Sequence, residues 1–321
     1  MEAKITDISG IKVGTAEDLE ALTGCTVVLA EEGAVGGVDV RGSAPGTRET
    51  DVLSPLNLVE KVHAVLLTGG SAFGLDAAAG VMAYLEERGI GYDTGKTVVP
   101  IVPAAVIFDL NVGDYRRRPD KEMGHQACRV AGKAVREGNA GAGAGATVGK
   151  ALGYEYCTKS GQGSSAVRLK NGLIVGALAV VNAYGDVVDP SSGEVIAGVR
   201  DPQGSGYLPT IEIWKKQGDA PNQAFAQNTT VAVVVTNARL TKSEAAKVAQ
   251  MAHDGMARVI VPCHTMYDGD TVFTMATGEV EADVNLVGML AQEVMISSII
   301  RAVAFAETIR GIPSAGIRLR L

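Results

Sequence analysis

Aromatic residues are scarce in this chain: they make up 4% of its 321 residues, and there is one tryptophan. A core with so few rings must be built from aliphatic side chains and alanine. Cysteine is equally rare, since only Cys25, Cys128, Cys157 and Cys263 occur and none forms a Cys-x-x-Cys pair. This spacing argues against a disulfide framework and against a zinc site.

The chain also lacks an excess of positive charge and a long apolar run. Its 36 acidic and 29 basic residues leave a net charge of −7, which argues against nucleic acid or an anionic membrane as a partner. No uninterrupted apolar run approaches the roughly 20 residues of a membrane span, and residues 1–7 lack the apolar core of a signal peptide. We therefore expect a cytoplasmic protein.

Glycine is abundant instead. The 40 glycines follow no repeat, which indicates turns and close backbone approaches. Strand and helix patterns are both frequent without alternating strictly, and this favours stacked sheets covered by helices over a doubly wound parallel sheet. The expected strands are 25–30, turning at 31–33 into 34–40, then 63–67, the extended stretch 98–110, the hairpin 166–170 with 173–181, and the strands 229–236 and 271–277. The expected helices are 72–88, 121–137, 241–257 and 284–306.

Two common site types fit poorly. In the glycine-rich stretch 138–149, Gly143 and Gly145 are followed by Gly149 one residue too late for a dinucleotide-binding loop, and Gly149-Lys150 is not followed by Ser or Thr as a P-loop requires. The four histidines show no metal-ligand spacing, so we expect each of them to be structural or exposed.

A more informative feature is the polar segment 217–228, which runs directly into a buried strand pattern at Asn228-Thr229. A plain strand entry accounts for this pattern. The alternative is an internal cleavage that makes Thr229 a new N-terminus. A threonine hydroxyl is a weak nucleophile that needs a base, and an α-amino group with a pKa of about 7.7–8.0 is suited to that task.

The segment Asp268-Gly269-Asp270 places two carboxylates on one turn before a strand. A solvated turn is one interpretation. The other is an acidic pair that holds the ammonium or hydroxyl group of Thr229 and exchanges protons with it. Carboxylates this close titrate as a pair.

Taken together, these segments resemble the DmpA-type aminopeptidases, and in particular their nylon-oligomer (6-aminohexanoate oligomer) hydrolase branch. The matching segments follow the same order over most of the chain: 67–75, 103–109, 141–150, 181–182, 228–230, 236–239 and 268–271.

The resemblance implies an α+β fold, an αββα four-layer sandwich, formed as one domain from residues 1–321. It implies self-cleavage into residues 1–228 and 229–321, which stay together as partners, and a homotetramer. It also implies hydrolysis of short peptides, of amides of β- or ω-amino acids, or of 6-aminohexanoate oligomers, without a metal or an organic cofactor.

Residue by residue, the resemblance assigns Thr229 as the nucleophile and Asn182 as the donor to the oxyanion. Asp268 and Asp270 match the acidic pair. Lys150 matches a lysine that lines the site, where we expect a fixed positive charge.

Phe108 stands where relatives carry a tyrosine, so a hydroxyl group is missing there. Phe108, Gly143 and Gly145 are candidates for the substrate pocket. Two other functions stay open: an acyltransferase similar to the ornithine acetyltransferases, which also cleave themselves before a threonine, and a non-catalytic binding protein on the same scaffold. The Asn-Thr cleavage context and the acidic pair favour hydrolysis.

Overall fold

A computed structural model describes residues 2–204, 206–218 and 228–316. Its α-helices are α1 (Ala77–Glu86), α2 (Lys121–Arg129), α3 (Thr210–Gln217), α4 (Lys242–Ala257) and α5 (Val284–Ala304). Its strands are β1 (Glu2–Ala3), β2 (Ile11–Asp18), β3 (Thr23–Val40), β4 (Thr47–Arg48), β5 (Lys61–Thr68), β6 (Tyr92–Asp93), β7 (Val98–Val99), β8 (Ala104–Val106), β9 (Thr147–Val148), β10 (Thr158–Lys159), β11 (Gln162–Arg168), β12 (Ile174–Asn182), β13 (Asp186–Val188), β14 (Val195–Ala197), β15 (Val199–Arg200), β16 (Tyr207–Leu208), β17 (Thr229–Ala238), β18 (Ile260–Val261) and β19 (Thr271–Val280).

Ten of these strands are joined in one hydrogen-bonded sheet. Its order is β1-β11-β12-β17-β19-β3-β5-β8-β4, and β2 pairs with β3 outside this path. The first part of the long strand β3 pairs with β2 and β5, whereas its last part pairs with β19. Strand β3 therefore passes from one half of the sheet to the other, and the two halves stack face to face around a shared apolar core.

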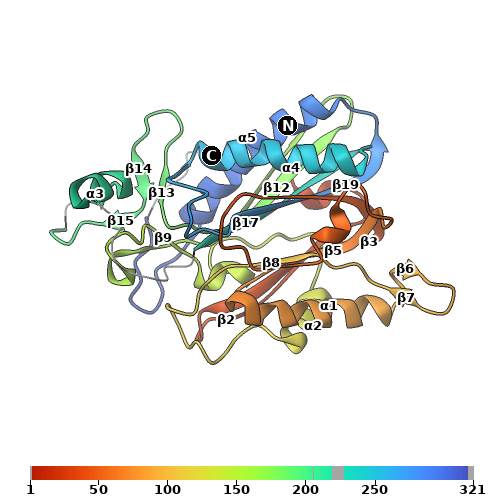
Figure 1. Ribbon diagram of the computed structural model, residues 1–321, viewed down its shortest axis with the longest axis horizontal. Helices are drawn as coiled ribbons and strands as arrows, with labels where there is room; N and C mark the ends of the chain where they lie inside the picture. The colour runs from red at the N-terminus through yellow and green to blue at the C-terminus, as the bar shows by residue number, and fades with distance from the viewer. Residues whose placement is uncertain (1, 205, 219–227, 317–321) are drawn as a thin grey trace.

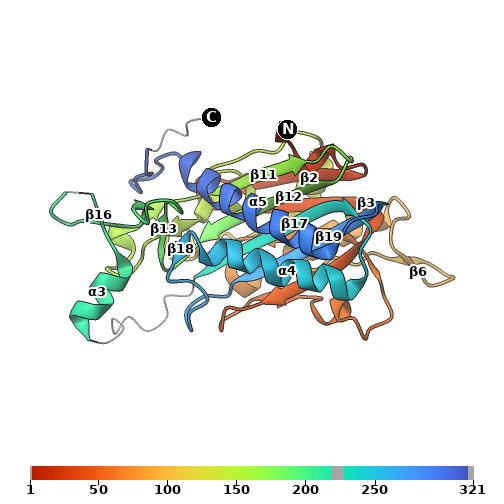
Figure 2. The ribbon, with the colours of Figure 1, turned by 90° about the horizontal axis from the view of Figure 1, so that it is seen from above.

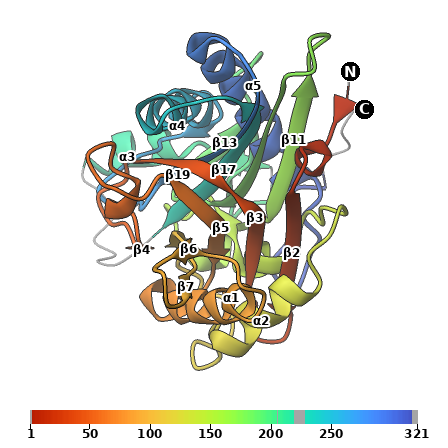
Figure 3. The same cartoon turned by 90° about the vertical axis from the view of Figure 1, so that its right-hand side faces the viewer.

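Three apolar cores separate four layers. In β17, Ala232 and Val234 face α4 and α5, while Val231, Val233 and Val235 face the other half of the sheet. Successive strand residues point to opposite faces, and a strand buried on both faces is apolar throughout. A third core lies between β2, β3 and β5 on one side and α1 and α2 on the other. This is the expected αββα sandwich (Figures 1 and 3).

Helices α4 and α5 lie side by side on one face of the sheet, α4 over β3 and β19 and α5 over β11 and β12 (Figure 2). By length and composition alone, α5 is long and apolar enough to cross a membrane, but 61% of its most apolar stretch is buried inside the molecule. A core helix of a soluble protein meets the same criterion, so this single helix is weak evidence for a membrane span.

Strand β3 is longer than predicted. The sequence suggested a turn at residues 31–33, but the strand continues through this segment to Val40. Its pairing with β5 shifts register between Leu29 and Ala34, and Gly33 adopts a φ of 77°. The extra residues are absorbed as a β-bulge, which bends a strand without ending it.

Helix α2 is shorter than the predicted 121–137 and ends at Arg129. Beyond it the chain pairs with β2, where Gly132 and Val13 exchange two backbone hydrogen bonds of 3.0 Å. The sequence pattern suggested that the helix continues past residue 129, and this tertiary pairing overrides that preference.

Several predicted elements are confirmed. Strands β11 and β12 form the hairpin around Asn171-Gly172. Thr241 and Glu244 form a capping box at the start of α4. Helix α3 was not predicted, and residues 219–227 of the predicted polar segment lie outside the described residues.

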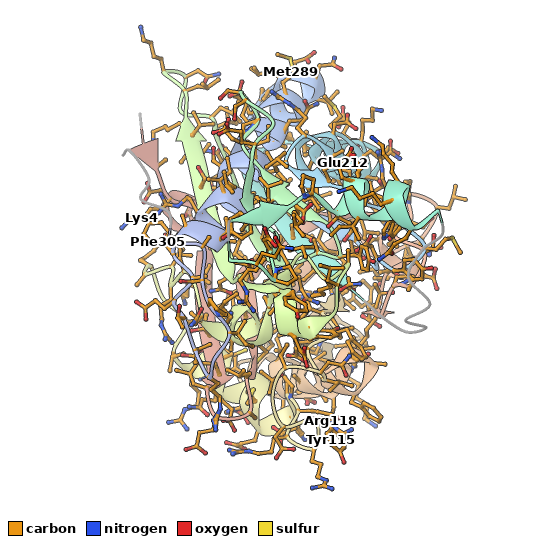
Figure 4. The ribbon with its side chains drawn as sticks, turned by 90° about the vertical axis from the view of Figure 1, so that its left-hand side faces the viewer. Lys4, Tyr115, Arg118, Glu212, Met289 and Phe305 are labelled. Carbon is orange, nitrogen blue, oxygen red and sulfur yellow. The ribbon has the colours of Figure 1, made fainter. Side chains whose placement is uncertain are left out.

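Three strand ends meet at one edge of the sheet. Strand β12 ends at Asn182, its antiparallel neighbour β17 begins at Thr229, and β19, parallel to β17, begins at Thr271. Antiparallel neighbours run in opposite directions and parallel neighbours run together, so these ends converge. Figure 4 looks at the side of the molecule that carries α3, marked by Glu212, with Met289 of α5 above it.

Candidate active site

Thr229 begins β17 directly opposite Asn182 of β12. Both face the core between the two sheet halves. Thr229 and Asn182 each lie two residues from a member of that core, Val231 and Val180, and residues two apart on a strand point to the same face. Thr229 is only 4% exposed. Its Oγ1 lies 2.5 Å from the carbonyl oxygen of Asn228, so the hydroxyl group lies beside the peptide bond that precedes it.

The carbonyl oxygen of Asn228 has a second donor. The backbone N–H of Gly269 donates to it at 2.8 Å, and the N–H of Asn228 donates to the carbonyl of Tyr267 at 2.8 Å. Gly269 also allows a close approach: a Cβ there would lie 2.8 Å from Oγ1 of Thr229 and 2.5 Å from the carbonyl oxygen of Ala44. The turn Asp268-Gly269-Asp270 therefore carries two carboxylates and also supplies a backbone donor to the carbonyl of Asn228.

Asp270 is 2% exposed and is held by three donors. Its Oδ1 accepts the backbone N–H of Thr230 at 2.7 Å. Its Oδ2 accepts the backbone N–H of His264 at 3.0 Å and lies 2.8 Å from Nδ1 of the same residue. These contacts fix the orientation of the Asp270 carboxyl group on both sides.

Asp268 is 1% exposed. Its Oδ2 accepts the backbone N–H of Thr265 at 3.0 Å and the Thr265 hydroxyl at 2.5 Å, and its Oδ1 accepts the N–H of Tyr184 at 3.4 Å. Burial, followed by the nearby charge of Asp270, raises the pKa of Asp268 to about 6. Asp268 is thus able to exchange a proton close to neutral pH.

Asn182 is fully buried and its side-chain amide is fixed at both ends. Its Oδ1 accepts the backbone N–H of Thr147 at 3.1 Å and the ammonium of Lys150 at 2.8 Å. Its Nδ2 donates to the carbonyl of Phe108 at 3.0 Å. An amide nitrogen carries two N–H groups, so this geometry leaves the second one available to an oxyanion.

Lys150 is 2% exposed and donates to two oxygens of the neutral Asn182, Oδ1 at 2.8 Å and the backbone carbonyl at 3.1 Å. Burial lowers the pKa of Lys150 to about 7, although the charges of Cys157, Asp268 and Asp109 oppose this shift. The ammonium therefore titrates near neutral pH. The sequence prediction of a fixed positive charge did not take the cost of desolvation into account.

Of the pocket candidates, Phe108 contacts this group directly, whereas the contacts of Gly143 are with Lys159 and with residues 138, 161 and 162. Phe108 contacts Asn182 through its own backbone carbonyl. Gly143 belongs to a buried 3-10 turn, and its carbonyl accepts a 2.9 Å hydrogen bond from the ammonium of Lys159. Lys159 is a second fully buried lysine that the sequence interpretation missed, and it also donates to the carbonyl of Ala146 at 3.1 Å.

Gly145, the third pocket candidate, packs against Asp109, since a Cβ at Gly145 would lie 2.6 Å from that of Asp109. Asp109 is buried and accepts the N–H of Gly70 and the hydroxyl of Thr23, both at 2.7 Å. Burial raises the pKa of Asp109 to about 6. The contacts of both glycines are those of tight backbone packing.

Sequence reasoning missed His264 and Thr265 as members of this group. Histidine was expected to be structural or exposed, whereas His264 contacts Asp270 and Thr265 contacts Asp268. A signal was available, because Thr265 precedes Asp268 by three residues and short polar side chains bond to each other across such turns.

Comparison with known proteins gives this group of residues a context. A family model described as Peptidase family S58 matches residues 3–315. An uncharacterized aminopeptidase of Mycobacterium leprae is 43% identical over 97% of this chain and 92% of its own length. A 6-aminohexanoate-oligomer endohydrolase of Kocuria sp. is 33% identical over 92% of this chain and 84% of its own length.

A solved structure shares the fold. The L-aminopeptidase D-Ala-esterase/amidase of Ochrobactrum anthropi, described as a variant of the Ntn-hydrolase fold, superimposes with a TM-score of 0.72. The match covers 97% of this chain and 88% of that chain at 17% identity, so the likeness concerns the fold alone.

Proposed function

Since the chain belongs to peptidase family S58 and is an amide hydrolase, we propose that Thr229 is its nucleophile and that the chain cleaves itself before this residue. The observation that supports this most strongly is the carbonyl of Asn228. Its oxygen lies 2.5 Å from Oγ1 of Thr229 and 2.8 Å from the backbone nitrogen of Gly269. A nucleophile and an oxyanion donor therefore already flank one peptide bond.

In the proposed cleavage, Oγ1 of Thr229 attacks the carbonyl carbon of Asn228 and the electron pair moves onto the carbonyl oxygen. The N–H of Gly269 stabilises that negative charge. The bond between carbon and nitrogen then breaks, and the proton from the hydroxyl group moves to the leaving nitrogen of Thr229. Water opens the resulting ester, which leaves a carboxylate on Asn228 and a free amino group on Thr229.

The new amino group supplies the base that Thr229 lacks in the intact chain. In the mature protein it accepts the proton of Oγ1 as the hydroxyl group attacks the amide of a substrate. We assign the stabilisation of the oxyanion to Asn182 and Lys150, and the exchange of protons with the amino group to Asp268 and Asp270. Oxyanion donors of this type contribute roughly 3–4 kcal/mol to the transition state.

For the substrate, we propose a small linear amide with a free amino group. Relatives are named as aminopeptidase and as 6-aminohexanoate-oligomer endohydrolase, so short peptides, amides of β- or ω-amino acids and 6-aminohexanoate oligomers are the classes to examine first.

A panel of anilides tests this proposal. The acyl groups are an α-amino acid, a β-amino acid and 6-aminohexanoate, and the proteins are the wild type, Thr229→Ala and Thr274→Val. The hydroxyl of Thr274 is buried in β19 and has no hydrogen-bond partner among the described residues, so Thr274→Val is a matched control. We expect hydrolysis by the wild type and the control only. Turnover by Thr229→Ala contradicts the proposal, and product formation that requires an added amine acceptor indicates acyl transfer instead.

A further inference from the structure

His264 occupies an unusual position next to the two carboxylates. It lies between β18 and β19 in the same turn as Asp268 and Asp270, and its φ is 56°. A residue with a Cβ rarely adopts this left-handed backbone, and such residues gather where function fixes the geometry. The conformation aims both the backbone N–H and the imidazole of His264 at Asp270.

The contact between the two residues is specific to one oxygen. Oδ2 of Asp270 accepts the backbone N–H of His264 at 3.0 Å and lies 2.8 Å from its Nδ1. A carboxylate can only accept hydrogen bonds, so Nδ1 is the nitrogen that carries the proton in this pair. The other carboxyl oxygen accepts the N–H of Thr230, which leaves Asp270 held on both sides.

Among the described residues, no imidazole donates to Asp268. Its donors are the backbone and hydroxyl of Thr265 and the backbone of Tyr184, and burial together with the charge of Asp270 raises the pKa of Asp268 to about 6. Two nearby carboxyl groups in unequal environments take different roles in one site, and the raised pKa marks Asp268 as the one suited to exchange a proton near neutral pH.

We propose that His264 is a positioning residue that holds and orients Asp270, and that Asp268 is thereby the member of the pair that exchanges a proton with the amino group of Thr229. This inference rests on the proposed function. Nothing in it requires His264 to touch the substrate.

The other ionisable groups that the structure describes near His264, Asp268 and Asp270 include His253, Cys263 and Lys150. The ring of His253 on α4 packs against that of His264 at a centroid distance of 4.8 Å, and burial lowers the pKa of His253 to about 4. Nε2 of His253 lies 3.0 Å from the carbonyl oxygen of Asp39, whose carboxylate is paired with Arg41. Cys263 precedes His264, and burial raises the pKa of the Cys263 thiol to about 12. Lys150 is close enough to Asp268 for the charge of the carboxylate to act on the pKa of the lysine.

Two substitutions separate the role of the ring from that of the backbone. His264→Gly removes the imidazole and tolerates the left-handed backbone. His264→Asn also tolerates it, and its Nδ2, bonded to Cγ like Nδ1 of histidine, restores a donor at the same place. His125→Gln, on α2 in the opposite helix layer, serves as the control.

We expect His264→Gly to lower kcat at least ~10-fold with KM within about twofold, and to move the acidic limb of the pH profile upward by about one pH unit. His264→Asn should recover kcat to within about threefold and return the limb to its original position. The inference is overturned if His264→Gly keeps the wild-type kcat and pH profile, or if His264→Asn is as impaired as His264→Gly.

A measurement that needs no turnover separates this inference from the proposed function. In Thr229→Ala, carbon-13 NMR of the aspartate carboxyl groups, assigned with Asp268→Asn and Asp270→Asn, follows proton uptake by the pair. Adding His264→Gly should raise the midpoint of that uptake, and an unchanged midpoint contradicts the inference. Failure of the wild type to cleave itself or hydrolyse amides counts against the proposed function alone.

Discussion

The ammonium group of Lys150 donates a 2.8 Å hydrogen bond to Oδ1 of Asn182, and both residues are almost completely buried. The contact fixes the orientation of the Asn182 amide, because the lysine can only donate and therefore selects the oxygen. It also places a positive charge in a site from which water is excluded, where charges act strongly but are costly to bury.

Lys150→Met should abolish activity and yet stabilise the protein. Burial lowers the pKa of Lys150 from 10.5 to about 7, so at pH 7 and below the folded state carries the full cost of the buried charge. Removing it should raise the free energy of unfolding by a few kcal/mol, to order of magnitude.

The pH dependence of the stability difference between Lys150→Met and the wild type shows whether the buried charge causes it. Between pH 7 and 10.5 the folded lysine is neutral while the unfolded one is still charged, so the wild type becomes more stable as the pH rises. Denaturant titrations of both proteins at about pH 6 and about pH 9.5 should show the advantage of Lys150→Met shrinking. An advantage of equal size at both pH values would show that packing, rather than charge, is responsible.

The two carboxylates should affect proton transfer rather than folding. Asp268→Asn and Asp270→Asn each keep the size and shape of the side chain, and we expect turnover to fall at least ~10²-fold in folded protein. In the wild type, kcat should rise through pH 6 as Asp268, whose pKa burial and Asp270 raise to about 6, loses its proton. Near-normal turnover in both variants, with unchanged melting temperatures, would exclude the pair from catalysis.

Gly269→Ala should slow self-cleavage while leaving most of the fold intact. The added Cβ would meet Oγ1 of Thr229 at 2.8 Å and the carbonyl oxygen of Ala44 at 2.5 Å, so the hydroxyl, the turn or both must move. Loss of near-attack geometry costs about 100-fold or more in rate. Gly132→Ala, where a Cβ would meet nothing within 4 Å and the backbone is not left-handed, is a control for the effect of the methyl group alone, and equal cleavage rates in the two variants would contradict this prediction.

Many strands and helices of the fold could be predicted from the sequence because their causes are local, whereas the four-layer arrangement was implied by the resemblance to a family. The apolar run that begins at Thr229, the hairpin at Asn171-Gly172 and the capping box at Thr241 each carry a pattern that specifies one element. The bulge at Gly33 and the early end of α2 depend on partners far along the chain, β5 and β2, which no local pattern shows.

The candidate site was predictable only in part for a similar reason. Thr229, Asp268 and Asp270 could be identified from residue type and spacing together with the resemblance to a family. The contacts and the burial that depend on tertiary packing could not be identified in this way. They are the hydrogen bond from the N–H of Gly269 to the Asn228 carbonyl, the contact between the ring of His264 and Asp270, and the burial that lowers the pKa of Lys150. These follow from the packing of strand ends that are distant in sequence.

The intact mass and N-terminal sequence of the purified protein test the central claim most directly. Self-cleavage between Asn228 and Thr229 predicts fragments of 228 and 93 residues, two bands under denaturing conditions and one species in size exclusion, since β17 lies between β12 and β19. The smaller fragment should begin Thr-Thr-Val-Ala, Thr229→Ser should still be cleaved, and Thr229→Ala should stay full-length and inactive. A wild-type chain that is fully active while intact would contradict the account.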